Sequence, residues 1–557
     1  MDTTSHPANP SSASGQSSKD PLRAQVVPRF ENGIELVEET FKQYKNESAF
    51  TCLGHTLSYA ELDRLSYRFA SYLRNDLKLK QGDVIAMQLP NILQFPVALY
   101  GAIRAGLVVS NANPLYTDRE IKHQLNDSGA VALVVLANVA SEAAQIIDET
   151  GVKHVIVTQI ADLHPFPKRQ LINFVVKYVK RLVKPFSFKN QIAFADTLEN
   201  RSSFEVTKPA PDDIMMLQYT GGTTGVAKGA MLTHRNITSN VWQLISHLPN
   251  AFEWGKEKFV ACLPLYHIYA FNIHGLSAFS RGGHNILIPN PRDMKAFIRT
   301  LEQHRFTVFP ALNTLFNALL RQEDFLKLDF SSLKVTCSGG MALTKDTATR
   351  WEAVTGSTIL EGYGLTETCP VIASCRPDKY KICTIGIPIA ETEIRLVDSD
   401  GRDVAQGDAG ELLIRGPQVM KGYLNRPDAT AEAISEDGFF ATGDIAVQDS
   451  DGYYKIVDRK KDMIIVSGFN VYPNEVEDIA SSHPEVLEAA AVGVPHDSSG
   501  EAVKLFVVKT AGSKLDEQTL RDFCREDLTA YKVPKFVEFR DDLPKSAVGK
   551  VLRKELR

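Results

Sequence analysis

The sequence lacks the features that mark several large classes of protein. Its 7 cysteines are an odd number, and no two of them have the CxxC spacing typical of a zinc or redox site. With 62 Lys and Arg against 67 Asp and Glu, the net charge of −5 shows none of the basic excess typical of nucleic-acid binding. We therefore expect free thiols, a reducing cytoplasmic compartment and no nucleic-acid partner.

Long hydrophobic runs are also absent. The most apolar long stretch, residues 95–109, is interrupted by Arg104 and falls short of the roughly 18 to 20 residues that a membrane span needs. Residues 1–25 are rich in Ser and Pro and contain no apolar segment of the signal-peptide kind. We predict a disordered tail over 1–25 and buried core over 95–109.

Helix and strand patterns alternate after this tail. Capping boxes that begin at Ser58 and Thr117 predict two helix starts. Apolar runs at residues 84–89 and 130–136 predict strands buried on both faces. Repeated βα units of this kind predict an α/β fold, with parallel sheets covered by helices in a large N-terminal unit of layered βα subdomains.

A block of charged residues divides the chain near its C-terminal end. Residues 458–462 read DRKKD, without one apolar side chain, and a segment of α+β pattern follows them. We predict an N-terminal domain over 26–459, a hinge at Lys460 and Lys461, and a small mobile C-terminal domain over 462–557. A charged surface turn within a single domain is the alternative.

One glycine- and threonine-rich loop has the composition of a phosphate-binding site. Residues 219–229 read YTGGTTGVAKG and follow an apolar run at 214–217 that predicts a strand. Glycines let the backbone approach a ligand, and successive N–H groups can bind an anion. No glycine lies five residues before a Gly-Lys-Ser/Thr triplet, so this is not a Walker A loop. The predicted ligands are Tyr219, Thr220, Gly221, Gly222, Thr223, Thr224, Gly225 and Lys228. A flexible hairpin without a ligand is the alternative.

This loop and five further motifs resemble the adenylate-forming superfamily, which includes acyl-CoA synthetases, luciferases and adenylation domains. The further motifs are LPLYH at 263–267, EGYGLTE at 361–367, ATGD at 441–444, DRKKD at 458–462 and PKSAVGK at 544–550. Within the superfamily, residues 457–475 resemble bacterial long-chain fatty acid to CoA ligases most closely. The resemblance implies that ATP converts a fatty acid to an acyl-adenylate, and that coenzyme A then takes the acyl group.

The resemblance also assigns catalytic roles. It implies that Lys550 bridges the substrate carboxylate and the α-phosphate, that Thr366 contacts the α-phosphate and that His267 lies near the carboxylate. Glu367 would hold Mg²⁺, with Thr220 close to the phosphates and the metal. Taken alone, Glu367 and Lys550 would more often be solvated side chains, and for His267 the alternative is a structural histidine.

The nucleotide and coenzyme A would be bound by residues from several motifs. The resemblance implies contacts to ATP from Gly339, Gly340, Glu361, Gly362, Tyr363, Gly364, Asp444 and Arg459. Among these, Tyr363 would stack on adenine, and Asp444 and Arg459 would contact the ribose. Rotation about Lys461 would later replace the lysine loop by residues 463–472, whose Gly468 leaves room for the pantetheine arm of coenzyme A.

Residues 258–292, which follow the glycine-rich loop, indicate the nature of the acid. Amino-acid-activating relatives carry an acidic residue in this region, which pairs with the substrate ammonium. In this sequence no Asp or Glu occurs between Lys258 and Arg292. The same region is largely apolar, which favours a hydrocarbon chain, and Phe271 is a candidate acyl-pocket residue. An aryl acid as substrate, or a catalytically silent nucleotide- or lipid-binding protein, are the rival interpretations.

Residues Leu171–Lys184 have the pattern of a basic amphipathic helix. Apolar residues fill one arc, and the other holds Asn173, Lys177, Lys180, Arg181 and Lys184. No Asp or Glu occurs in residues 165–195. Peripheral contact with an anionic membrane, on the inner face of the cytoplasmic membrane, and packing of the apolar arc on the core are the two interpretations. A homodimer is a further open possibility.

Overall fold

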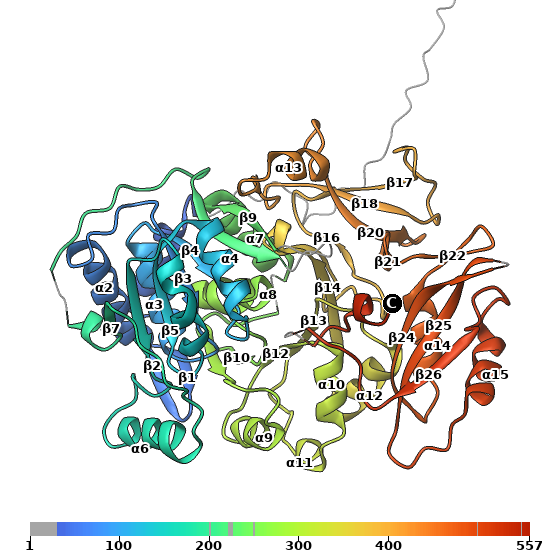
Figure 1. Ribbon diagram of the computed structural model, residues 1–557, viewed down its shortest axis with the longest axis horizontal. Coiled ribbons are helices and arrows are strands. Elements are labelled where there is room, and N and C mark those ends of the chain that lie inside the picture. The colour runs from blue at the N-terminus through green and yellow to red at the C-terminus, as the bar shows by residue number, and fades with distance from the viewer. Residues whose placement is uncertain (1–29, 200–201, 221–226, 249–250, 498, 547–548) are drawn as a thin grey trace, which may run out of the picture.

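The computed structural model describes residues 30–199, 202–220, 227–248, 251–497, 499–546 and 549–557. The predicted disordered tail therefore lies outside the described residues. Figure 1 shows two large sheets flanked by helices in the N-terminal part of the chain, and a smaller sheet with its own helices formed by the last residues. This arrangement confirms the α/β class, with a large N-terminal and a small C-terminal part.

The first large sheet carries the predicted phosphate loop. In spatial order its strands are β19 (Gly422–Tyr423), β9 (Lys228–Thr233), β8 (Ile214–Thr220), β4 (Val108–Asn111), β3 (Val84–Gln88), β5 (Ala130–Leu136), β6 (His154–Thr158) and β7 (Gln191–Ala193). From β8 to β7 every pairing is parallel, whereas β8 and β9 form an antiparallel hairpin. Strand β5 is apolar throughout because helices cover both faces of the sheet.

The second large sheet brings the later motifs together. Its strands are β16 (Ile387–Pro388), β15 (Val371–Ser374), β14 (Ile359–Gly364), β13 (Val335–Ser338), β12 (Val308–Ala311), β10 (Lys258–Ala261), β11 (His284–Leu287), β1 (Ser48–Cys52) and β2 (His55–Ser58). The pairings from β14 to β1 are parallel, and the edge pairings are antiparallel. Ligands of open parallel sheets bind beyond the carboxyl ends of the strands, which is where the motifs after β10, β13 and β14 begin.

Two further sheets lie on either side of the predicted hinge. An antiparallel sheet contains β17 (Glu393–Val397), β18 (Gly410–Arg415), β20 (Phe440–Gln448) and β21 (Tyr454–Arg459). The C-terminal sheet contains β23 (Phe469–Val471), β22 (Ile464–Val466), β25 (Gly500–Lys509), β24 (Val486–His496) and β26 (Phe536–Arg540). The C-terminal part has a hydrophobic core of its own, so it has the packing expected of a domain.

Helices cover the faces of the sheets. The helices are α1 (Gly33–Tyr44), α2 (Tyr59–Asn75), α3 (Gln94–Arg104), α4 (Asp118–Ser128), α5 (Ala140–Ile146), α6 (Lys168–Phe174), α7 (His234–His247), α8 (Ile268–Ala270), α9 (Met294–Glu302), α10 (Asn313–Leu320), α11 (Glu323–Leu326), α12 (Lys345–Thr355), α13 (Pro427–Ala433), α14 (Pro473–Ser481) and α15 (Glu517–Asp527). Both predicted capping boxes are present, at the starts of α2 and α4. Every residue of α3 is buried, as predicted for this apolar run. Among the described residues, no helix has both the length and the apolar composition needed to cross a membrane.

The predicted amphipathic helix is shorter than expected and starts earlier. It consists of α6 and a π-helical turn, Val175–Val179, and a positive φ of 51° at Arg181 ends the helical path. Lys184, predicted on its polar arc, lies beyond the helix and pairs with Glu142 at 2.9 Å. No residue of α6 or of the turn is fully buried, but Ile172, Val175 and Val176 are half-buried and Val183 packs against a hydrophobic cluster, so both interpretations of this segment stay open.

Candidate active site

The β8–β9 hairpin presents a positive charge beside the predicted phosphate loop. Thr220 at the end of β8 lies opposite Lys228 at the start of β9. The ammonium of Lys228 lies 5.1 Å from the ring centre of Tyr423, and the hydroxyl of Tyr219 donates to Asp127 at 2.8 Å. Gly221, Gly222, Thr223, Thr224 and Gly225 lie outside the described residues.

A cavity of about 1010 Å³ lies between this hairpin and the carboxyl ends of the second large sheet. Predicted site residues that line it are Tyr219, Thr220, Lys228, His267, Gly339, Gly340, Gly362, Tyr363, Gly364, Thr366, Glu367, Arg459 and Lys550. Apart from Gly339 and Gly340, which follow β13, they come from five of the six motifs, and the remaining motif, ATGD, contributes Ala441, Thr442 and Gly443 to the wall. Motifs that lie far apart in the sequence therefore surround one space.

Two glycines of the cavity wall are required by geometry. A side chain on Gly364 would place its Cβ 1.8 Å from the carbonyl oxygen of Pro370, which no residue tolerates. Gly340 has a φ of +81°, in the left-handed region that favours glycine. Glycine at these two positions therefore allows the backbone that follows β13 and the end of β14 to adopt the conformation that forms the cavity wall.

Three side chains form a polar group on one side of the cavity. The Tyr363 hydroxyl donates a hydrogen bond to one carboxylate oxygen of Asp444, and Arg459 Nε lies 2.9 Å from the other. Asp444 and Arg459 are paired residues of β20 and β21, so the sheet register sets their contact. Asp444 itself is only 2% exposed and does not line the cavity.

Glu367 lies at the polar end of the cavity, in the short turn that follows β14. Its Oε1 accepts a hydrogen bond of 2.8 Å from the hydroxyl of Tyr423, and burial raises its pKa. Thr366 precedes it in the same turn and also lines the cavity. No cluster of three metal-ligating side chains occurs among the described residues. One carboxylate facing a phosphate site suits Mg²⁺, which keeps several waters and binds substrate phosphates.

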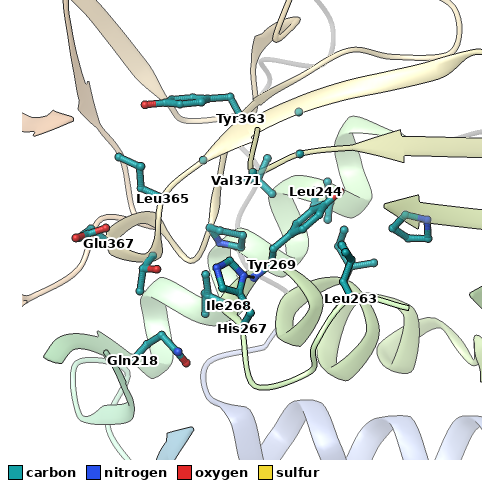
Figure 2. Close-up of a pocket in the computed structure, with 18 of the residues that line it drawn as sticks. Gln218, Leu244, Leu263, His267, Ile268, Tyr269, Tyr363, Leu365, Glu367 and Val371 are labelled. Atoms are coloured by element: carbon teal, nitrogen blue, oxygen red, sulfur yellow. Dashed lines mark hydrogen bonds between the residues drawn. The ribbon is translucent and has the colours of Figure 1, made fainter. Parts of the chain in front are cut away.

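The cavity continues from this polar end into an apolar arm. His267 lies where the two meet, with Ile268 and Tyr269 beside it and Gln218 on the opposite side (Figure 2). Its Nδ1 accepts from the amide of Tyr269 at 3.3 Å, and burial lowers its pKa to about 4. The ring is therefore neutral near pH 7, with its proton on Nε2. The arm is lined by Leu244, Ile245, Leu248, Phe252, Trp254, Phe259, Ile273, Val308 and Leu360.

Lys550 reaches this cavity from the C-terminal domain. It lines the wall together with Ser546 and Arg459, and the neighbouring Gly549 lies against Thr314 of α10. Burial first, and then the positive charge of Arg459, lower the pKa of Lys550 to about 8, and Asp444 opposes the shift. The residue still keeps solvent-exposed surface at the cavity mouth. The structure thus brings the terminal lysine to the polar end of the cavity.

Several predicted residues lie elsewhere. Phe271 is 1% exposed in the main hydrophobic core and is not among the residues that line the cavity, so its part in an acyl pocket stays a prediction. Glu361 accepts from the amide of Leu343 at 2.8 Å and supports the wall from behind, and burial raises its pKa to about 8. Gly468, between β22 and β23, is not at the cavity in this domain orientation.

The comparisons with known proteins agree with this geometry. A model of the AMP-binding enzyme family matches residues 37–424, and a model of the AMP-binding enzyme C-terminal domain matches residues 475–550. The chain belongs to the AMP-binding enzyme family. The predicted hinge falls between the two matched regions, and its position at Lys460 and Lys461 stays a prediction.

Relatives and solved structures of the AMP-binding family cover nearly the whole chain. A long-chain-fatty-acid–CoA ligase of Escherichia coli O157:H7 is 51% identical over 95% of this chain and 94% of its own. A 4-coumarate–CoA ligase of Oryza sativa is 33% identical over 95% of this chain and 92% of its own. The ATP-bound structure of MatB from Rhodopseudomonas palustris has a TM-score of 0.81 and 29% identity, covering 94% of this chain and 98% of that one.

Two residues of this AMP-binding site were not found from the sequence. The hydroxyl of Tyr423 donates to Glu367, and its ring lies against the ammonium of Lys228. Tyr423 is 56 residues from Glu367 in the sequence and reaches it only because β19 pairs with β9. Gln218 faces the cavity, and its Nε2 donates to the carbonyl of Tyr266 at 3.2 Å. Gln218 directly precedes the glycine-rich motif on β8, which is the one signal that could have marked it.

The pKa of Lys550 predicts how the first step of an AMP-binding enzyme depends on pH. If the ammonium must be charged, kcat/KM for pyrophosphate exchange without coenzyme A should fall about tenfold per pH unit above about pH 8. The Lys550→Arg variant is the control, since its guanidinium keeps its proton in this range and should show no such limb at its lower rate. If the Lys550→Arg variant showed the same fall in rate at alkaline pH, the fall could not be caused by deprotonation of Lys550.

Proposed function

We propose that the protein is an AMP-forming long-chain fatty acid–CoA ligase, which feeds acyl-CoA to fatty-acid degradation and lipid metabolism. The observation that carries the proposal is one cavity with a cationic, hydroxyl-bearing end and an apolar arm, joined at His267. An enzyme that joins a fatty acid to ATP needs both environments next to each other. The name and 51% identity of the Escherichia coli relative support this substrate class.

In the first step, a carboxylate oxygen attacks the α-phosphorus of ATP and pyrophosphate leaves. Both reactants are anions, and the ammonium of Lys550 at the polar end lies where it can bridge them. Lys228 and the hydroxyls of Thr220 and Thr366 stabilise negative charge that develops on the phosphates. The neutral His267 donates from Nε2 toward the carboxylate without adding charge.

Magnesium would be held by Glu367, with Thr220 nearby on the same side of the cavity. The ion would supply charge neutralisation for the leaving pyrophosphate. Tyr423 orients the Glu367 carboxylate through a hydrogen bond to one of its oxygens.

The nucleoside would lie against Tyr363 and the glycine turn after β13. Arg459 and Asp444 form the group beside it, and the ribose hydroxyls would contact them. Because Asp444 is buried and already bonded to both neighbours, it binds ribose only by exchanging or sharing these bonds.

In the second step, the thiol of coenzyme A attacks the acyl carbonyl, and AMP leaves with the oxygen that came from the fatty acid. Lys550 occupies the polar end in the present orientation. Rotation about Lys461 would withdraw it and bring residues 463–472 to the cavity. Gly468, at the tip of this hairpin, has a φ of +83° and no side chain, and it would leave room for the pantetheine arm after the rotation.

The apolar arm predicts the acid class. Each buried CH₂ contributes roughly 0.8 kcal/mol, so kcat/KM should rise steeply with chain length until the arm is filled. Fatty-acid-dependent pyrophosphate release should be strongest for long saturated acids and at least about tenfold weaker for an aryl acid such as 4-coumarate. Equal or better activity with the aryl acid would replace the long-chain assignment by an aryl one.

We also propose that α6 and its π-helical turn contact an anionic membrane surface. Exposed apolar side chains gather there: Phe166 (81% exposed), Leu171 (62%), Phe174 (55%), Tyr178 (59%), Val179 (65%) and Leu182 (54%). Lys177, Lys180 and Arg181 accompany them, and α6 projects from the lower edge of the molecule in Figure 1. Apolar side chains flanked by cations suit the surface of an anionic bilayer, where free fatty acids partition.

The membrane proposal is tested by charge reversal. The triple variant of Lys177, Lys180 and Arg181 to Glu should lose most sedimentation with phosphatidylglycerol vesicles, since each basic residue near the surface contributes about 1 kcal/mol. A matched triple reversal of the exposed Lys514, Arg525 and Lys535 in the C-terminal domain should leave sedimentation unchanged. If both triple variants lost sedimentation equally, the binding would depend on the net charge of the protein, and the proposed contact through α6 would be contradicted.

A further inference from the structure

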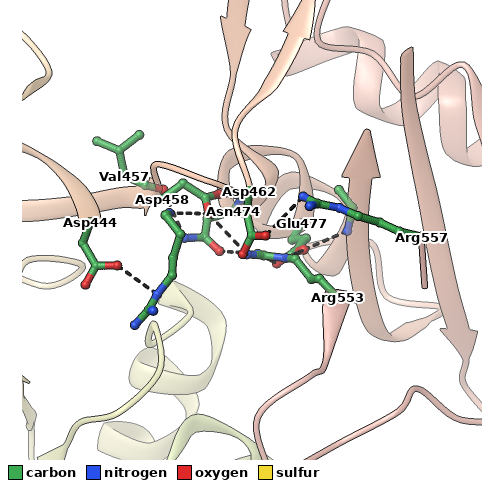
Figure 3. Close-up of polar contacts among 10 residues, drawn as sticks. Asp444, Val457, Asp458, Asp462, Asn474, Glu477, Arg553 and Arg557 are labelled. Atoms are coloured by element: carbon green, nitrogen blue, oxygen red, sulfur yellow. Dashed lines mark hydrogen bonds and ion pairs between the residues drawn. The ribbon is translucent and has the colours of Figure 1, made fainter. Parts of the chain in front are cut away.

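A buried ionic network surrounds the predicted hinge. Arg553, in the last helical turn of the chain, donates from Nε and one Nη to the two carboxylate oxygens of Glu477 at 2.9 and 2.7 Å. It also donates to Asp458 at 3.2 Å and to the side-chain oxygen of Asn474 at 2.6 Å (Figure 3). The second arginine of this segment, Arg557, pairs with Asp462 at 3.1 Å.

The network joins the two sides of the hinge. Asp458 belongs to β21 and precedes the hinge, whereas Arg553 and Asn474 follow it. Asn474 forms a second link across the hinge. Its backbone amide donates to the carboxylate of Asp458 at 2.7 Å, and its side-chain amide donates to the backbone carbonyl of Val457 at 3.1 Å. The Asp458 side chain is 0% exposed and that of Arg553 is 15% exposed.

The contact between Asp458 and Arg553 depends on the orientation of the C-terminal domain. A buried carboxylate that loses its cation is strongly destabilised, since burial without pairing is costly. Arg553 and Glu477 belong to the same domain and would stay paired during a rotation, but Arg553 and Asp458 would separate. Arg553 also follows Lys550 by three residues in the same segment, so an anchored Arg553 restrains the segment that carries the lysine.

We propose that Asp458 and Arg553 form a latch that keeps Lys550 in the cavity and thereby favours the adenylate-forming orientation over the thioester-forming one. Both are positioning residues, because neither lines the cavity. The inference rests on the proposed ligase activity and its two half-reactions. It adds a specific pair of side chains that sets the balance between them.

The latch is tested by measuring the two half-reactions separately. Asp458→Asn keeps the shape of the side chain and lies outside the C-terminal domain. We expect fatty-acid-dependent ATP–pyrophosphate exchange without coenzyme A to fall about tenfold or more, while thioester formation from purified acyl-adenylate stays within about twofold. Arg553→Met should show the same split, and Arg553→Lys should restore part of the exchange rate.

The control is Arg525→Met, which removes an arginine whose partner, Asp522, lies in the same helix. It should change neither rate. Equal losses of both half-reactions in Asp458→Asn, or no loss of exchange, would overturn the latch. A wild-type protein that makes no acyl-CoA would instead overturn the proposed function, so the two failures are distinguishable.

A measurement on the wild-type protein avoids any folding defect of the variants. Amide hydrogen exchange at Asn474 reports its bond to Asp458. We expect protection with a non-hydrolysable acyl-adenylate analogue and at least about tenfold faster exchange after coenzyme A is added. Equal protection in both complexes would contradict a latch that opens between the steps.

Discussion

Replacing Lys550 by alanine is expected to abolish acyl-adenylate formation while preserving thioester formation from supplied acyl-adenylate. The ammonium lies at the polar end of the cavity, where it can hold the carboxylate and the α-phosphate together. Loss of one preorganised charge at such a site costs about 10²- to 10³-fold in rate. Pyrophosphate exchange measures the first step, and a single turnover of acyl-adenylate with coenzyme A measures the second.

The matched control is Lys545→Ala, which removes a lysine of the same motif. Lys545 pairs with Glu488 and Asp542, both at 2.8 Å, and does not line the cavity. Its loss should leave pyrophosphate exchange within about threefold of the wild-type rate. Exchange at a near wild-type rate in Lys550→Ala would show that another group performs the bridging.

Replacing Lys461 by proline is expected to have the opposite effect, preserving adenylation and suppressing thioester formation by about 10²-fold. Proline fixes φ near −65°, so a hinge that changes its backbone angles at this residue cannot rotate. Lys461 is exposed in a turn between β21 and β22, where the change removes no core packing. The two half-reaction assays used for Lys550 provide the measurement.

Lys461→Ala is the control, because it removes the same side chain and leaves the backbone free. It should keep both half-reactions within about threefold. Equal losses of adenylation and thioester formation in Lys461→Pro would mean that proline disturbs the fold near Arg459 rather than the rotation. Retention of both would place the hinge elsewhere.

Local features of this fold were predictable from the sequence because they depend on neighbouring residues. The capping box at Ser58 and the apolar run at 130–136 each specify one element, and both are confirmed. The order of six motifs indicated the family, and the family models and relatives confirm it. The fully buried α3 followed from an apolar run too short to span a membrane.

Features that depend on packing between distant elements were not predictable. Phe271 follows His267 by one helical turn, and only the tertiary structure places it in the main hydrophobic core and not among the residues that line the cavity. The role of Tyr423 depends on the pairing of β19 with β9. The helix after Lys168 ends early because Arg181 adopts a positive φ, which a periodicity argument does not detect. Side-chain pairs across the hinge, such as Asp458 and Arg553, depend on domain orientation in the same way.

The most direct test of the account is the fate of the carboxylate oxygen. When a fatty acid labelled with ¹⁸O in both carboxyl oxygens is converted with ATP and coenzyme A, attack on the α-phosphorus should transfer one labelled oxygen to AMP. The other should remain in the thioester carbonyl. Mass spectrometry of the products should therefore find one ¹⁸O in each AMP. Unlabelled AMP, or label released in inorganic phosphate, would contradict an acyl-adenylate formed in this cavity.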